Sequence, residues 1–251
     1  MISIEGPAGS LFNDTLAGDV GDNTLLGRDG GDVLGGGAGN DVLDGGTGVD
    51  LASYLYLASG ATLTLGTQIV VGAGDTDTLL SIEGLAGTSF DDRLTGDAGA
   101  NVLRGNSGND WLDGSGGIDF ADFSAATAAL TIVLDSAATI TVADGLGGTD
   151  TLVSIEALIG GAFADTLAGD AGNNTFRGGA SSDTIAGGGS DMVDFFSAGA
   201  GITLTLDGGG TVVVADGRGG TDSLVGIGNV IGSLFNDTLT GDATANTLAG
   251  R

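Results

Sequence analysis

The apolar residues of this chain recur with a period of nine. From Gly9 the sequence divides into GSLFNDTLA, GDVGDNTLL, GRDGGDVLG, GGAGNDVLD and GGTGVDLAS, which together span 9–53. Every unit begins with glycine, and the eighth position is Leu in the first four units and Ala52 in the fifth. The triplet around the eighth position predicts a very short strand with one inward side chain. One unit buries too little to be stable, so we expect stacked units with a continuous core.

The nine-residue pattern returns in two further blocks. The second reads GTSFDDRLT, GDAGANVLR, GNSGNDWLD and GSGGIDFAD, and the third begins GGAFADTLA, GDAGNNTFR and GGASSDTIA. The octamer FNDTLAGD at 12–19 returns as FDDRLTGD, FADTLAGD and FNDTLTGD. We therefore predict an elongated all-β solenoid of repeated blocks. The predicted boundaries are 1–86, 87–159 and 160–231, each a block with its connector, and 232–251 as the start of a fourth block.

The connectors at 54–86, 124–159 and 197–231 also predict strands. The alternating segments ATLTL, LTIVL and ITLTL are followed by QIVV, TITV and TVVV. Two connectors end with an Asp and a Glu at equal separation, Asp77 with Glu83 and Asp150 with Glu156. One interpretation is a turn followed by a strand with an exposed acid, and the other is an extra cation site. The third connector has Gly228 in place of the glutamate, so a site there should be weaker or absent.

The sixth position of most units is aspartate. Repeated glycines permit positive φ values and close backbone approach, so the turn carbonyls and the Asp carboxylate can converge. Such hard oxygen donors suit Ca²⁺. The predicted metal ligands at this position are Asp14, Asp32, Asp41, Asp50, Asp92, Asp110, Asp119, Asp165, Asp183 and Asp237, with Asp77, Glu83, Asp150 and Glu156 as candidates in the connectors. An isolated Asp in such a turn would instead bond to nearby backbone.

The third block departs from the pattern in its last unit, GGGSDMVDF. Met192 occupies the ligand position, Asp191 lies one residue early, and Asp194 falls on the apolar position. A one-residue deletion explains this slip. We therefore expect no normal site there.

The formal net charge is −27, with six arginines and no lysine or histidine. This balance argues against nucleic acids and anionic membrane surfaces as partners. No stretch is long enough to predict membrane insertion, no cysteine is present, and no ordinary secretory signal is visible. Glycine-rich, charged chains often stay disordered, but the 41% hydrophobic content favours folding once metal neutralises the charge.

The units resemble the glycine- and aspartate-rich repeats of RTX (hemolysin-type) proteins, whose motif is G-G-x-G-x-D-x-U-x. GGAGNDVLD at 36–44 and GGTGVDLAS at 45–53 match it best. The resemblance implies a parallel β-roll in which several calcium ions lie between neighbouring turns on the same side. It also implies type I secretion, although the C-terminal signal is not visible here. The repeat blocks are also similar to the R-modules of mannuronan epimerases.

Catalytic interpretations fit the sequence poorly. No strand–glycine loop–helix pattern supports dinucleotide binding, and a Walker loop requires a lysine. The carboxylates recur with a structural period that no single active site requires, and no EF-hand loop is present. Tyr54 and Tyr56 are better explained as residues that end a block of the roll. We therefore predict that the chain is not an enzyme.

The function that we expect is metal-coupled folding outside the cell. Binding of calcium cancels the repulsion between carboxylates and closes the turns, so binding free energy becomes folding free energy. We expect an extracellular or cell-surface structural or adhesive segment of a secreted bacterial protein, which could assemble end to end into filaments or a surface layer. The alternative is an accessory module that binds an alginate-like polysaccharide through Arg28, Arg93, Arg104 and Arg177.

Overall fold

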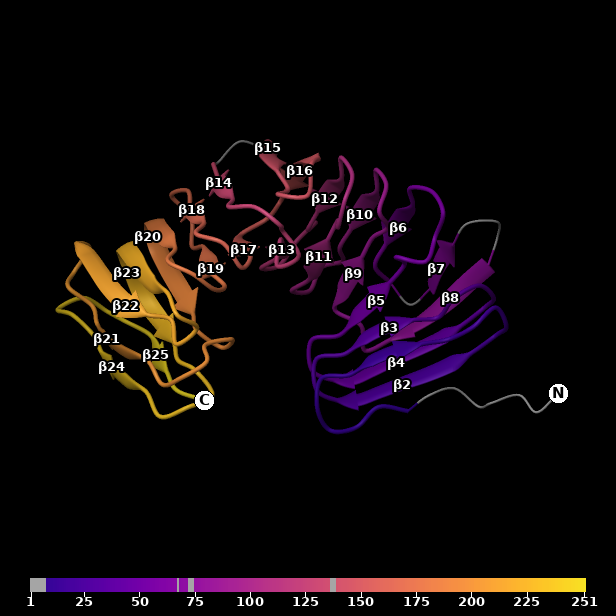
Figure 1. Cartoon of the computed structure of the whole chain (residues 1–251), viewed down its shortest axis with the longest axis horizontal. Helices are drawn as coiled ribbons and strands as arrows, with labels where there is room; N and C mark the ends of the chain where they lie inside the picture. Colours follow the sequence, from indigo (N-terminus) through magenta and orange to yellow (C-terminus); the bar gives the residue numbers. More distant parts are fainter. Residues whose placement is uncertain (1–7, 67, 72–74, 136–138) are drawn as a thin grey trace. The chain divides into compact units, whose positions relative to one another are not determined.

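The computed structural model describes residues 8–66, 68–71, 75–135 and 139–251, and these form strands and turns without a helix (Figure 1). The remaining residues lie outside this description. They include the N-terminal stretch searched for a secretory signal and parts of the first two connectors. No helix long and apolar enough to cross a membrane occurs among the described residues. The chain divides into two compact units, Met1–Phe120 with Gly148–Ser154, and Ala121–Gly147 with Ile155–Arg251.

The first unit is a solenoid in which successive strands alternate between opposite sides. One side orders its strands β1 (Thr15–Ala17), β3 (Val33–Gly35), β5 (Leu51–Ser53), β9 (Gly84–Ala86) and β11 (Val102–Arg104). The other side has the order β2 (Thr24–Asp29), β4 (Val42–Thr47), β8 (Asp75–Leu80) and β7 (Gln68–Val71), and a further sheet has β16 (Thr149–Val153), β12 (Trp111–Asp113), β10 (Arg93–Thr95) and β6 (Thr62–Thr64). The strand β13 (Phe120–Asp122) begins at the last residue of the first unit's main segment.

The second unit repeats this arrangement. Its parallel pairs join β14 (Thr131–Val133) to β18 (Thr166–Ala168), β17 (Ala157–Ile159) to β19 (Thr175–Arg177), and β21 (Thr203–Thr205) to β24 (Thr238–Thr240). The long strands β20 (Thr184–Asp194) and β23 (Thr221–Ile231) pair with each other and continue both sides, and β25 (Leu248–Ala249) pairs with β23. The unit also contains β15 (Ile140–Ala143) and β22 (Thr211–Ala215).

The strand pairing follows directly from the nine-residue period. Thr15 pairs with Val33, and Thr24 pairs with Val42, so one full coil consists of two units. The pairs between units are parallel, whereas β7 and β22 pair antiparallel with the strands that follow them. The predicted all-β, mostly parallel architecture is therefore confirmed, with two short hairpins added by the connectors.

The core is a column of the eighth-position side chains. Leu25, Leu34 and Leu43 are completely buried, while the residues on either side of each are exposed or only partly covered. This confirms one inward residue for these x-U-x triplets. Ala52 is also completely buried, but its neighbour Leu51 is buried as well, in a second cluster with Ala86 and Val102.

The connectors are longer coils of the same solenoid. Their first strands, β6, β14 and β21, pair in parallel with β10, β18 and β24. Their ends return to the nonapeptide spacing, because an acid precedes a buried leucine by two residues in Asp77–Leu79, Asp150–Leu152 and Asp222–Leu224. The predicted block boundaries themselves stay a prediction.

Glycine is required where consecutive coils touch. Gly48 has a φ of +150°, and a Cβ atom at this position would collide with the carbonyl oxygen of Gly30 in the previous coil. No other residue allows both this backbone conformation and this approach.

Candidate metal centre

The sixth-position carboxylates form a ladder that runs along each side of the solenoid. In most of them Oδ1 accepts a backbone N–H from the adjacent position one coil earlier. Asp32 Oδ1 lies 2.8 Å from the Asp14 nitrogen, and Asp50 Oδ1 lies 2.6 Å from the Asp32 nitrogen. Asp41, Asp110, Asp119 and Asp183 make the equivalent bonds, each at 2.8 Å. One oxygen of each carboxylate therefore has a structural role.

The second carboxylate oxygen separates two classes of turn. We define the open turns as those with positive φ at both the second and the fourth position. In the first open turn these residues are Arg28, with a φ of 85°, and Gly30, with a φ of 126°. The open turns are 27–32, 36–41, 45–50, 105–110, 114–119 and 178–183.

In four of the open turns, Oδ2 lacks the donors that a buried carboxylate needs. The Oδ2 atoms of Asp32, Asp41, Asp50 and Asp183 are buried and accept no hydrogen bond from any described residue. All four side chains are at most 1% exposed. A buried, ionised oxygen without a partner costs several kcal/mol or more, so these atoms indicate a missing positive ligand.

Backbone carbonyl oxygens lie beside these unpartnered atoms. A Cβ atom on Gly27 would collide with Asp32 Oδ2 and lie close to the Gly45 carbonyl oxygen of the next coil. A Cβ atom on Gly45 would likewise lie 2.6 Å from Asp50 Oδ2 and collide with the Ser81 carbonyl oxygen. Each open turn of this pair thus presents a carboxylate oxygen and a carbonyl oxygen on the same face of its first glycine. This donor set fits a hard divalent cation such as Ca²⁺.

Burial shifts the titration of these carboxylates. Burial, with the nearby Asp32 and Glu83 carboxylates, raises the pKa of Asp50 to about 6. Burial, with Asp222 and Asp165 nearby, raises the pKa of Asp183 to about 7. The raised pKa values mean that the charged form of these groups is disfavoured in the absence of a cation.

The first two turns of each block are of a different class. We define the closed turns as 9–14, 18–23, 87–92, 96–101, 160–165, 169–174, 232–237 and 241–246, in which the side chain at the sixth position accepts an N–H from its own turn. Asp165 Oδ2, for example, accepts the Gly161 N–H at 2.7 Å, while Oδ1 accepts the Leu130 N–H at 2.8 Å. Asp14 and Asp92 are bound in the same way by Ser10 and Thr88.

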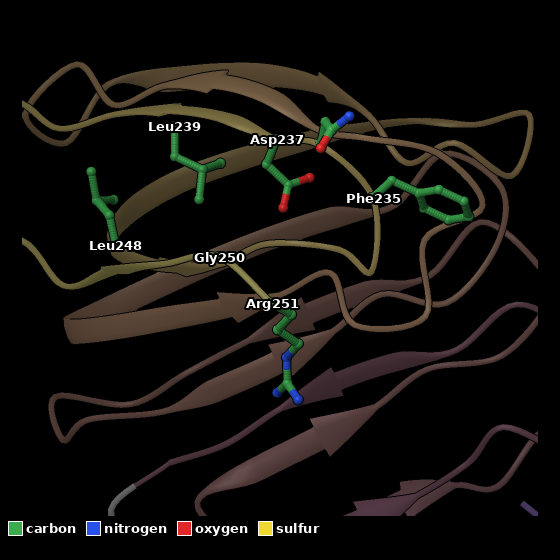
Figure 2. Close-up of a pocket in the computed structure, with 7 residues that line it drawn as sticks. Phe235, Asp237, Leu239, Leu248, Gly250 and Arg251 are labelled. Atoms are coloured by element: carbon green, nitrogen blue, oxygen red, sulfur yellow. The ribbon is translucent and has the colours of Figure 1, made fainter. Parts of the chain in front are cut away.

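Asp237 shows how little a closed turn leaves for a cation. It lies at a hollow of about 390 Å³ lined by Phe235, Leu239, Leu248 and Arg251 (Figure 2). Its Oδ2 accepts the Ser233 N–H at 2.9 Å, and its Oδ1 accepts the Ser233 hydroxyl at 2.6 Å. Both oxygens are therefore already hydrogen-bonded despite the adjacent hollow.

Asparagine replaces aspartate in the second turn of each block. The Asn101 amide oxygen accepts the Asp97 N–H at 2.8 Å, and its Nδ2 donates to the Asp97 carboxylate at 3.1 Å and to the Glu83 carbonyl oxygen at 3.3 Å. Asn174 donates in the same way to the Glu156 carbonyl oxygen. The amide thus links adjacent coils through hydrogen bonds alone.

The structure does not join Asp77 and Glu83 in one site. Asp77 Oδ1 accepts the Asp41 N–H at 3.0 Å on one side, and Glu83 Oε2 accepts the Asp50 N–H at 3.1 Å on the other. Asp77 is 1% exposed, which excludes the interpretation as an exposed acid, and its side chain interacts with that of Tyr54. Asp150 is buried and accepts the Asp110 N–H at 3.0 Å, whereas Glu156 is half-buried.

Asp191, Asp216 and Asp222 are among the buried acids that the sequence interpretation did not propose as ligands. Asp191 is fully buried, and it continues the ladder by accepting the Asn174 N–H at 2.8 Å while its Oδ2 accepts the Gly188 and Gly189 N–H groups. The one-residue deletion is absorbed by a register shift in β20. Asp222 continues the ladder from Asp183, and Asp216 is buried in the preceding turn. The D-x-L spacing of Asp222 was a usable signal.

Donors other than carboxylates must complete any metal site. No three acidic side chains converge as a metal-binding cluster within the described parts of the chain. Three of the open turns meet this condition, because the Cβ positions of Gly27, Gly45 and Gly114 lie beside backbone carbonyl oxygens. Two of the arginines assigned to polysaccharide binding have internal partners, since Arg93 stacks on Trp111 and Arg177 pairs with Asp194 at 2.8 Å. Tyr54 is buried, and its N–H donates to the Ala86 carbonyl oxygen where the first block ends.

Comparison with known proteins supports the same interpretation. A solved structure, the extracellular lipase LipA from Serratia marcescens, matches at 16% identity with a TM-score of 0.25. The match covers 87% of this chain, which spans 37% of the lipase, and a score this low carries no conclusion about fold or activity. No curated protein matches the chain. The family model of the RTX calcium-binding nonapeptide repeat matches four times, at residues 8–43, 18–52, 86–121 and 159–191. Over these residues the chain consists of RTX calcium-binding repeats.

Proposed function

We propose that this chain is a non-catalytic β-roll whose folding is coupled to calcium binding at the open turns. The observation that carries the proposal is the set of buried, unpartnered Oδ2 atoms of Asp32, Asp41, Asp50 and Asp183. These atoms recur at the position that the RTX motif assigns to its aspartate. The closed turns satisfy the same position internally, so we assign them a structural role.

Charge provides the coupling between binding and folding. The net charge is −27, and folding brings open-turn carboxylates of successive coils into a ladder. Without a counter-ion this arrangement is repulsive and leaves buried oxygens unsolvated. When calcium is bound, it supplies positive charge and a preference for oxygen ligands. The protein places one carboxylate oxygen and one carbonyl oxygen toward the same point, and its glycines keep that space clear.

We further propose that the folded roll acts as a structural or adhesive segment of a secreted bacterial protein. Extracellular calcium modules work at about 10⁻⁴–10⁻³ M, so such a chain stays unfolded where calcium is scarce and folds outside the cell. The absence of cysteine is compatible with this because calcium replaces disulfides as the stabilising link. Sedimentation in calcium tests whether the roll also assembles end to end: growth with protein concentration supports filaments, and a constant monomer mass contradicts them.

The coupling is tested by a calcium titration followed by circular dichroism and by fluorescence of Trp111, the single tryptophan, which lies in β12 beside an open turn. We expect strand signal and a blue-shifted emission to appear together as calcium rises, and both to disappear with chelator. Magnesium at the same concentration is the control, because it demands octahedral geometry and keeps its water. An unchanged strand signal in chelator would reject the proposal.

A further inference from the structure

The turn between β22 and β23 contains a buried acid that the repeat pattern does not explain. Asp216 is 2% exposed, and its Oδ1 accepts the N–H groups of Arg218 at 2.8 Å and Gly220 at 2.9 Å. Its Oδ2 is also buried and accepts no hydrogen bond from any described residue. One oxygen therefore shapes the turn, and the other points into the protein without a partner.

The unpartnered oxygen faces a carbonyl group of the neighbouring coil. A Cβ atom on Gly220 would lie 2.8 Å from Asp216 Oδ2 and would collide with the Ser181 carbonyl oxygen. Gly220 therefore leaves a space that is bordered by one carboxylate oxygen and one carbonyl oxygen. This is the same combination of donors that occurs at Gly27 and Gly45, the first glycines of two open turns.

The surroundings of this space are strongly negative. Asp222 and Asp183 lie nearby and are at least 98% buried, since their exposed fractions are 2% and 1%. No ion pair involves Asp183, Asp216 or Asp222 among the described residues. The arginine of the turn, Arg218, is exposed, and its Nε donates to the Ser197 carbonyl oxygen instead. The protein thus supplies no cation of its own.

We infer that Asp216 Oδ2 and the Ser181 carbonyl oxygen form a binding site for a divalent, calcium-like cation that clamps the β22–β23 hairpin onto the open turn 178–183. The inference rests on the proposed calcium-dependent folding and adds a site outside the nonapeptide motif. The remaining coordination positions are filled by water, because the turn lies next to the exposed residues Arg218 and Gly219. The hairpin strand β23 already pairs in parallel with β20, and the cation adds a link at the turn.

The second connector contains the same turn. DGLGGTD at 144–150 corresponds to DGRGGTD at 216–222. Asp144 is 1% exposed, and its Oδ1 accepts the Leu146 N–H at 2.8 Å, which matches the bond from Arg218 to Asp216. A buried acid that recurs with the same turn geometry is a feature of the connector rather than an accident of one turn.

The substitution Asp216→Asn tests the site because it keeps Oδ1 as the acceptor for the turn. Bound calcium is counted by equilibrium dialysis at about 1 mM free calcium, within the range of extracellular modules. We expect Asp216→Asn to bind one ion fewer than the wild type. Asp207→Asn is the matched control, because Asp207 is exposed and the same charge is removed, and it should bind as many ions as the wild type. Equal binding by Asp216→Asn and the wild type would overturn the inference.

A crystal of the wild-type chain grown with calcium gives an answer that does not depend on a variant folding. Anomalous scattering should show a peak between Asp216 Oδ2 and the Ser181 carbonyl oxygen. Peaks at the open turns without one at this position would overturn this inference but leave the proposed function standing. The absence of peaks at all these positions would contradict both.

Discussion

The open and closed turns share a sequence pattern but solve the same electrostatic problem in opposite ways. In the closed turn 160–165, both oxygens of Asp165 receive backbone N–H groups. In the open turn 45–50, Asp50 Oδ1 receives the Asp32 N–H, and its Oδ2 remains buried without a donor. The closed turn therefore satisfies its carboxylate with backbone donors, whereas the open turn has no such donor for Oδ2, and we propose that calcium binds there.

The backbone at the second position separates the two classes. In open turns this residue has positive φ, as in Arg28 and Gly37, whereas the N–H of Ser10 or Gly161 points back to the carboxylate in closed turns. The orientation of the peptide N–H at the second position thus decides whether the sixth-position carboxylate receives a hydrogen bond from its own turn. Each block opens with closed turns, so we expect these to form a cation-independent start on which the open turns depend.

The largest expected effect comes from filling the contact between two open turns. Gly48→Ala adds a Cβ atom that collides with the Gly30 carbonyl oxygen and forces a side chain into a φ of +150°. We expect a loss of at least about 3 kcal/mol of folding free energy, which calcium does not restore, as measured by urea unfolding in calcium. Gly66→Ala is the control, because nothing lies within 4 Å of its Cβ position, and it should change stability by less than about 0.5 kcal/mol. Similar stability of the two variants contradicts the close packing of the coils.

The metal-free chain should respond strongly to pH because several open-turn and ladder acids titrate together. The folded pKa is about 6 for Asp50 and Asp77 and about 7 for Asp183, above the unfolded value of 3.8. The folded form therefore binds protons more tightly, so stability is gained as pH falls from about 7 toward the unfolded pKa of 3.8 and is lost as pH rises through the same window. In chelator, circular dichroism should show more strand at pH 5 than at pH 8.

General charge neutralisation would also favour compaction at low pH, so a variant must separate the two causes. Asp183→Asn removes a group with a raised pKa, and Asp19→Asn removes an exposed charge. The midpoint of the pH transition should move only for Asp183→Asn. Equal shifts in both variants would assign the transition to net charge alone.

A smaller effect should distinguish one open-turn acid from one closed-turn acid. Asp50→Asn keeps Oδ1 as an acceptor but removes the carboxylate from the proposed site. At a calcium concentration 100 times the dissociation constant, loss of one ion costs about 2.7 kcal/mol, and in chelator the variant should be no less stable than the wild type. Asp165→Asn instead places an amide donor against a backbone N–H, so it should destabilise equally with and without calcium. Unfolding curves in calcium and in chelator measure both, and the same calcium dependence in the two variants would remove the distinction.

The periodic part of this structure could be predicted because the same residue types recur at fixed positions every nine residues. Glycine at the first position and leucine at the eighth specify the coil length and the inward side chain, and both are observed in 36–44. The RTX resemblance is confirmed by the family matches. The individual metal ligands stay a prediction, since an aspartate at the sixth position is common to both classes of turn.

The difference between the classes could not be taken from the presence of glycine. Arg28, Asn106 and Ser115 adopt positive φ at the second position of open turns, whereas Gly161 stands at that position in a closed one. Tertiary stacking decides this backbone conformation. A signal was nevertheless present: Ser or Thr at the second position with Phe at the fourth, as in GSLF and GTSF, begins closed turns in which the hydroxyl binds the carboxylate.

The smallest predicted effect tests whether a closed turn can be made to require calcium. Asn101→Asp replaces an amide donor by an oxygen that faces the Glu83 carbonyl oxygen and the Asp97 carboxylate. We expect a loss of about 1–2 kcal/mol of folding free energy in chelator, because the new carboxylate oxygen faces two other acceptors, the Glu83 carbonyl oxygen and the Asp97 carboxylate, with no hydrogen between them. Calcium should not restore this loss, since the second position, Asp97, keeps its N–H directed at the sixth-position side chain. Asn40→Asp is the matched control: its oxygen already acts as an acceptor for the Thr76 N–H, so the added charge should change stability by less than about 0.5 kcal/mol. Full recovery of Asn101→Asp in calcium would mean that the side chain alone decides whether a turn binds a cation, and that the backbone at the second position follows it.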